Sequence, residues 1–131
     1  MSEGRLLIAR FGPWSAEGCR KNAQGTYEDD VENGHEPARY GVSVFGGHLR
    51  VGETRDDLVC RICGCVPVTG RKVAVVWADE LEQQGWAVHL NMPPDMHYLV
   101  GQGGLAELPD FDALALLWAE HKVNNPALQK G

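Results

Sequence analysis

The 131-residue sequence predicts an α+β domain, with a mixed or mostly antiparallel sheet of about five to six strands and two to three helices packed largely on one face. Three observations support this class. Short apolar or alternating runs recur between glycine and proline turns, as strands do. Two segments have helical spacing behind a capping residue. The order of these segments, with strands adjacent to strands, differs from the strict alternation of a parallel α/β fold.

The first strand is expected in the apolar run from Arg5 to Phe11, which ends at Gly12-Pro13. Residues 12–39 then show no sustained period, so a long irregular segment is predicted there, which is either a functional loop or a flexible acidic excursion with a short helix near residues 16–22. Loops beyond about 12 to 15 residues are uncommon in compact domains and are often functional. Residues 12–39 are therefore a candidate functional site.

A β-hairpin is expected next. Residues 40–45 alternate as a strand, Gly46-Gly47 follows, and residues 48–51 are able to return as a second strand. Two glycines between such runs are a recognised hairpin signal, because glycine readily adopts the positive φ that the turn needs.

A helix is expected to begin near Arg55. Thr54 and Asp57 have the spacing of a capping box, with Asp in place of the usual Glu or Gln. At 100° per residue, the apolar side chains that follow fall on one arc of about 140°, which is typical of a helix docked on a sheet. The side chains on this arc are Leu58, Val59, Ile62, Cys63 and Val66.

The C-terminal half continues with alternating strands and helices. The continuous apolar run Lys72–Trp77 predicts a strand that is covered on both faces. The further expected elements are a helix at 78–84 that stops at Gly85, strands at 86–90 and 96–100 joined by a turn at 93–95, a helix at 110–121 and a polar tail at 124–131. Residues 1–131 are expected to form a single compact domain.

Composition excludes several classes of function. The formal net charge is -6, which disfavours a surface that binds nucleic acid. Apolar stretches of about 18 residues are absent from the sequence, so no membrane segment is expected. The cysteine spacings are too tight for ordinary mutual disulfides, so reduced thiols and a cytoplasmic location are predicted.

The cysteine cluster Cys60, Cys63 and Cys65 admits two interpretations. The first is helix packing with no cofactor, in which Cys63 is a small buried apolar residue. The alternative is a structural zinc site, because thiolates two residues apart in a tight turn bind zinc. Zinc needs four ligands, and no second Cys-x-x-Cys pair is present to supply them.

An enzyme is the second alternative. Arg10 at the end of the first strand, Ser43 on a later strand and the long segment between them form an arrangement similar to the opening of ADP-ribosyltransferases of the arginine-serine-glutamate type. The resemblance implies a small enzyme with an ADP-ribosyltransferase-like cleft, although the family's catalytic glutamate motif has no match here. His89 and His97, on the predicted strand pair, are further acid–base candidates.

The leading hypothesis is a small acidic protein-interaction or regulatory module of bacterial type, such as an inhibitor or immunity protein, that binds a basic protein partner. Charge complementarity steers such partners together. No catalysis is required, and the oligomeric state is left open. The predicted partner-binding residues are all in the long irregular segment: Trp14, Tyr27, Glu28, Asp29, Asp30 and Glu32.

Overall fold

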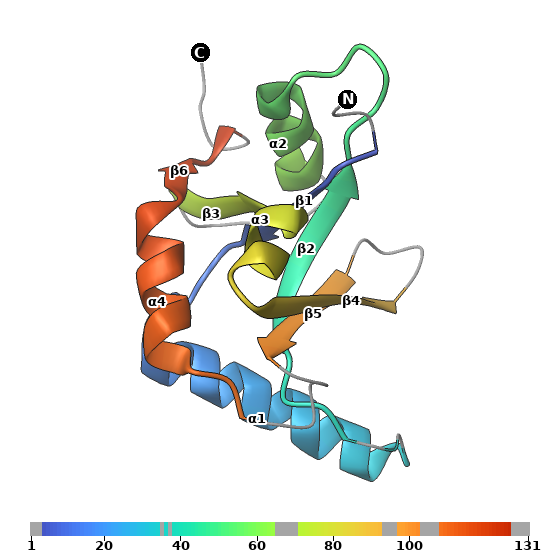
Figure 1. The fold of residues 1–131 in the computed structure, drawn as a ribbon, viewed down its shortest axis with the longest axis vertical. Coiled ribbons are helices and arrows are strands. Elements are labelled where there is room, and N and C mark those ends of the chain that lie inside the picture. Colours follow the sequence, from blue (N-terminus) through green and yellow to red (C-terminus); the bar gives the residue numbers. More distant parts are fainter. Residues whose placement is uncertain are drawn as a thin grey trace.

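The structure is a computed structural model that describes residues 4–34, 36, 38–64, 71–92, 97–102 and 108–126. These residues form one antiparallel sheet of six strands in the order β4-β5-β2-β1-β3-β6, together with four helices (Figure 1). The predicted α+β class is therefore confirmed. The elements are β1 (Leu6–Arg10), α1 (Ala16–Glu32), β2 (Val42–His48), α2 (Arg55–Gly64), β3 (Lys72–Trp77), α3 (Ala78–Gln83), β4 (Trp86–Met92), β5 (His97–Gln102), α4 (Phe111–Glu120) and β6 (Lys122–Asn124).

The sheet buries both of its faces. Because successive side chains of a strand point to opposite faces, Ile8 of β1 belongs to one apolar cluster and Leu7 to the other. Side chains of α1, α3 and α4 complete the cluster around Ile8, and side chains of α2 complete the cluster around Leu7. Figure 1 shows α1 and α4 on the side of the molecule remote from α2. β3 is buried on both faces, as its continuous apolar sequence predicts.

The prediction of an irregular segment at residues 12–39 is wrong, because α1 occupies most of it. Ser15 caps the helix by accepting a hydrogen bond from the N–H of Gly18. The buried side chains of α1 are Cys19, Ala23 and Asp30. Small and acidic side chains give almost no hydrophobic periodicity, so the helical pattern is hidden in the sequence.

The predicted hairpin at Gly46-Gly47 is also wrong, because β2 continues through both glycines to His48. Gly46 lies opposite Ile8 of β1. A Cβ atom at Gly46 would lie 3.0 Å from the ring of Tyr98 and 3.1 Å from the Ile8 side chain. Gly46 therefore allows close packing inside the sheet, which is the other common reason for glycine in a strand.

The capping box before α2 is confirmed. The Asp57 N–H donates to Thr54 Oγ1, and the Thr54 N–H donates to the Asp57 carboxylate, both at 3.1 Å. Leu58, Val59, Ile62 and Cys63 are buried as expected.

The polar tail predicted at 124–131 is wrong at its first two residues. Asn124 is the last residue of β6, and Asn125 is buried, with its N–H donating to the carbonyl of Arg71. Residues 127–131 and the turn predicted at 93–95 lie outside the described residues. Within the described part of the chain, no helix has the length and apolar character to cross a membrane.

Candidate functional site at the acidic end of α1

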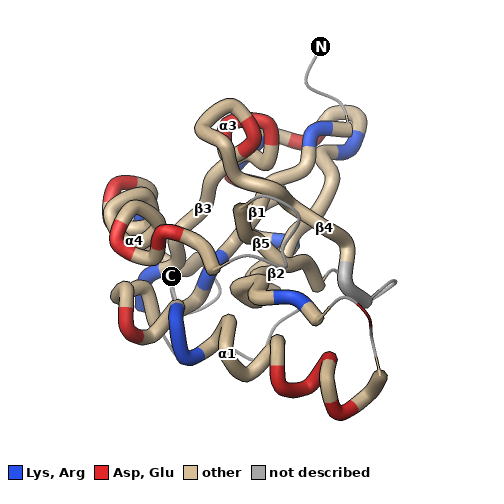
Figure 2. The backbone as a smooth tube through the Cα atoms, turned by 60° about the horizontal axis from the view of Figure 1, so that its bottom comes forward, with Lys and Arg blue, Asp and Glu red and all other residues tan. Residues whose placement is uncertain are grey.

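The C-terminal turns of α1 present the densest group of exposed carboxylates that the sequence analysis selected. Glu28, Asp29 and Glu32 are exposed, and the exposed fraction of Val31 between them is 59%. These four residues are called the acidic end of α1. Figure 2 shows most of the acidic residues of this helix toward one end, whereas its basic residues lie toward the other end, together with Glu17 of the first turn. The surface is thus strongly polarised along a single element.

The acidic end is held in place by two contacts with the segment that leads into β2. The Asp30 carboxylate accepts hydrogen bonds from Arg39 Nε at 2.8 Å and Nη2 at 3.0 Å, and also from the Arg39 N–H at 2.9 Å. Asp30 is only 7% exposed, and its carboxylate raises the pKa of Arg39 by direct hydrogen bonding. The rings of Tyr27 and Tyr40 stack with centroids 4.2 Å apart. Asp30 and Tyr27 therefore anchor the helix, and Asp30 is not part of the exposed surface.

The charges at this end oppose the helix itself. The C-terminus of a helix carries partial negative charge, so carboxylates there are unfavourable by about 0.3–1 kcal/mol each at low ionic strength. The last turn of α1 has no basic residue to offset them. Glu28 and Glu32 also stand four residues apart, a spacing at which like charges repel. The Gln24 side chain donates a hydrogen bond to the Glu28 carboxylate at 3.1 Å, and this bond offsets the unfavourable charge of only one of the carboxylates.

Trp14, which was predicted to share the partner surface, lies at the opposite end of α1. The helix has 17 residues and so spans about 25 Å. Trp14 Nε1 donates to the carbonyl of Arg10 at 2.8 Å, and Lys122 Nζ lies 4.3 Å from the centre of its ring. The half-buried indole therefore joins β1 to the start of β6. The structure does not bring it together with the carboxylates.

Arg10 and Ser43 meet, but not through the Ser43 hydroxyl. Arg10 is 4% exposed on the α1 side of the sheet, and its Nη1 donates to the Ser43 carbonyl at 2.6 Å. Its Nε and Nη2 donate to the Pro13 carbonyl. Burial lowers the pKa of this arginine. Because Val42 and Val44 belong to the α1-side cluster, the Ser43 side chain points to the other face.

The two histidines also face away from Arg10. His89 of β4 lies opposite Leu99 of β5, and His97 is two residues before Leu99, so both histidines share the face of Ser43. The His97 ring packs edge-on against Phe45 with centroids 5.6 Å apart. Arg10 is separated from these three residues by the sheet. The four enzyme candidates therefore do not line a common cleft.

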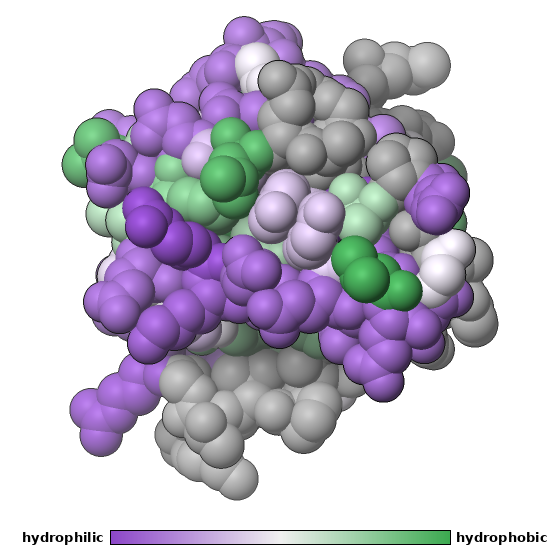
Figure 3. Space-filling view, turned by 90° about the horizontal axis from the view of Figure 1, so that it is seen from below, coloured by the Kyte–Doolittle hydropathy of each residue, from purple (hydrophilic) through white to green (hydrophobic). Residues whose placement is uncertain are grey.

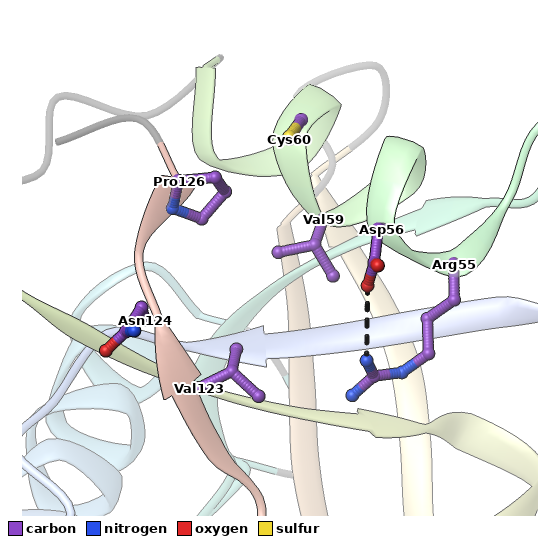
Figure 4. A pocket seen from close by; sticks show the side chains of 7 residues that line it. All are labelled: Arg55, Asp56, Val59, Cys60, Val123, Asn124 and Pro126. Atoms are coloured by element: carbon purple, nitrogen blue, oxygen red, sulfur yellow. Dashed lines mark ion pairs between the residues drawn. The ribbon is translucent and has the colours of Figure 1, made fainter. Parts of the chain in front are cut away.

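The two described cysteines of α2 differ in burial. Cys63 is buried, which raises the pKa of its thiol to about 11, whereas Cys60 is exposed. Cys60 borders a hollow of about 190 Å³ between α2 and β6, with Val59 and Val123 at its base (Figure 4). Arg55 and Asp56 form an ion pair of 3.7 Å at its rim. No group of three or more metal-ligating side chains is found among the described residues, and Cys65 lies outside them.

The face of the molecule that carries α1 is predominantly hydrophilic. Figure 3, seen from that side, shows a few separate hydrophobic side chains within a mainly polar surface. A partner that binds there has to make mainly polar contacts. Val31 and the helical register of the acids were missed by sequence reasoning. The inward positions Ala16, Cys19, Ala23, Tyr27 and Asp30 do have a 3–4 spacing, but they include small and charged residues, so their hydrophobic periodicity is too weak to reveal the helix.

The fold and this surface define the class as a small α+β domain with a polarised acidic helix. No family model, curated protein or solved structure matches the chain. Its function therefore has to be inferred from the geometry alone.

Proposed function

We propose that the protein is an interaction module that binds a basic protein partner through the acidic end of α1. The observation that carries this proposal is the placement of Glu28, Asp29 and Glu32 where the helix is already negative. Folding alone favours basic residues at these positions. Carboxylates at the C-terminus of α1 go against this preference, and no basic residue in the last turn offsets them. Such departures are expected at functional sites, where a partner supplies the missing interaction.

The chemistry of the site indicates what kind of partner fits. The exposed carboxylates accept hydrogen bonds and attract lysine or arginine, and Val31 offers a small apolar contact between them. The Asp30–Arg39 pair and the Tyr27–Tyr40 stack hold the surface rigid before binding, which lowers the entropy lost on association. Electrostatic steering toward a basic partner follows from the net charge of -6.

Isothermal titration calorimetry with a synthetic lysine-rich peptide tests the proposal. The variant Glu28→Lys/Asp29→Lys/Glu32→Lys is compared with a control, Glu82→Lys/Asp112→Lys/Glu120→Lys, whose exposed carboxylates lie on α3 and α4. Both variants bring the formal net charge to zero. We expect the α1 variant to lose measurable binding and the control to keep most of it. An equal loss of peptide binding in the two variants would show that binding depends only on the net charge of the protein, and would refute a specific site on α1.

A further inference from the structure

The two edges of the sheet differ in their protection against pairing with another strand. β6 is three residues long, carries the exposed Lys122 and is followed by Pro126. Short length, lysine and nearby proline are devices by which proteins block edge-to-edge association. β4 is seven residues long and its sequence contains no charged residue and no proline. Within the described residues, its outer side pairs with no strand.

The side chains of β4 are arranged to continue an apolar layer beyond the edge. Val88 lies opposite Val100 and packs against the cluster on the α1 side of the sheet, and Trp86 is buried in that cluster. Leu90 has the same orientation because it is two residues further along the strand. Its exposed fraction is nevertheless 51%, since no described element covers it. Along this row of apolar side chains, Trp86 is therefore covered by the rest of the domain, whereas Leu90 is exposed to solvent.

We infer that β4 is a self-association edge, which pairs antiparallel with β4 of a second copy about a twofold axis at Val88. This register places Leu90 directly opposite Trp86 of the second copy, and the twofold axis repeats the contact. On the other face it places His89 opposite Ala87 of the second copy. The register shift between Leu90 and Met92 limits the new ladder to residues 86–90.

A second copy fits this edge better than a charged partner does. Each copy has a net charge of -6, so two copies repel each other overall, and a contacting segment without charges adds nothing to this repulsion. β4 is such a segment. In the twofold register, the apolar Trp86 of one copy lies opposite the exposed Leu90 of the other. The acidic end of α1 lies on a different element and takes no part in this contact.

Sedimentation velocity across a range of protein concentrations tests the inference. We expect the wild-type protein to reach twice its 14.4 kDa chain mass at high concentration. The variant Leu90→Lys places a charge opposite Trp86 at both symmetric positions, so the dimer should dissociate about 100-fold more readily, at roughly tenfold per site. His89→Lys alters the other face of the same strand and should weaken the dimer without changing the apolar layer.

The matched control is Leu116→Lys, because Leu116 is 69% exposed on α4 and lies away from β4. This variant should dimerise as the wild type does. Backbone amides of residues 86–90 should also exchange hydrogen more slowly as the wild-type concentration rises. A wild-type protein that stays monomeric at high concentration would overturn the inference. A dimer that survives both Leu90→Lys and His89→Lys, or that is lost equally in Leu116→Lys, would place the interface elsewhere.

Discussion

At the scale of single residues, glycine has opposite roles at two positions in this domain. A Cβ atom at Gly41 would lie 2.6 Å from Leu99 Cβ, a contact that real side chains do not make. A Cβ atom at Gly25, in the middle of α1, would meet no atom within 4 Å. Gly41 is therefore required by packing, whereas Gly25 weakens the helix without a packing reason.

Alanine substitutions at these two glycines should change stability in opposite directions. We expect Gly41→Ala to lower the free energy of unfolding by about 1–3 kcal/mol through overpacking. We expect Gly25→Ala to raise it by about 0.5–1 kcal/mol, since alanine favours helix formation. Urea denaturation of the two variants measures both effects. A stabilising Gly41→Ala would mean that β2 and β5 are not packed as closely as described.

Glu53 provides a pH-dependent contact before α2. Its carboxylate accepts hydrogen bonds from Arg61 Nε and Nη2, both at 2.9 Å, and from the Arg50 N–H at 3.0 Å. The bonds from Arg61 contribute most to lowering its pKa from 4.5 to about 2. Because the folded-state pKa is depressed, this contribution to stability is fully present above about pH 4.5 and is lost as the pH falls toward 2.

The variant Glu53→Gln tests this linkage. Wild type should be more stable than the variant near neutral pH, and the difference should shrink between about pH 4.5 and 2, where the wild-type carboxylate gains its proton. Thermal unfolding followed at a series of pH values gives the comparison. A difference that is independent of pH would assign the effect of Glu53 to packing instead of its charge.

At the scale of elements, the sequence predicts best the segments whose large apolar side chains keep a clear period. The α2 helix, with its capping box and its buried face of Leu58 and Ile62, and the doubly covered β3 could both be predicted. α1 could not, because its buried face consists of small residues and the ion-paired Asp30. A Gly-Gly pair is compatible with a hairpin turn and with a tightly packed strand. At Gly46 the reason for the strand is the contact with Tyr98, a residue distant in the chain, so the local sequence does not distinguish the two.

Neutralising the acidic end of α1 should stabilise the protein. The variant Glu28→Gln/Asp29→Asn/Glu32→Gln removes carboxylates from the negative end of the helix, so we expect the free energy of unfolding to rise by about 1–2 kcal/mol at low ionic strength. The gain should fall with added salt. The control Asp112→Asn removes a carboxylate from the first turn of α4, where it is favourable, and should lower stability. A destabilised α1 variant would show that these carboxylates serve the fold.

At the scale of the whole molecule, the α+β class and the antiparallel pairing of β4 with β5 followed from strand patterns and the order of the elements. The candidate site was predicted only in part. The carboxylates Glu28, Asp29 and Glu32 were identified from composition, whereas the distance to Trp14 and the burial of Asp30 depend on a helix that the sequence concealed. The position of Arg10 across the sheet from Ser43, His89 and His97 likewise depends on strand register, which single residues do not reveal.

The binding role of the acidic end is tested most directly by mapping the backbone amide resonances of 15N-labelled protein as the lysine-rich peptide is added. We expect the shifts to concentrate at the last two turns of α1 and the adjoining residues around Arg39 and Tyr40, and to weaken as salt is added. Shifts that concentrate on the strands around Ser43 and His89, or that spread evenly over all acidic residues, would contradict the assignment of α1 as the recognition surface.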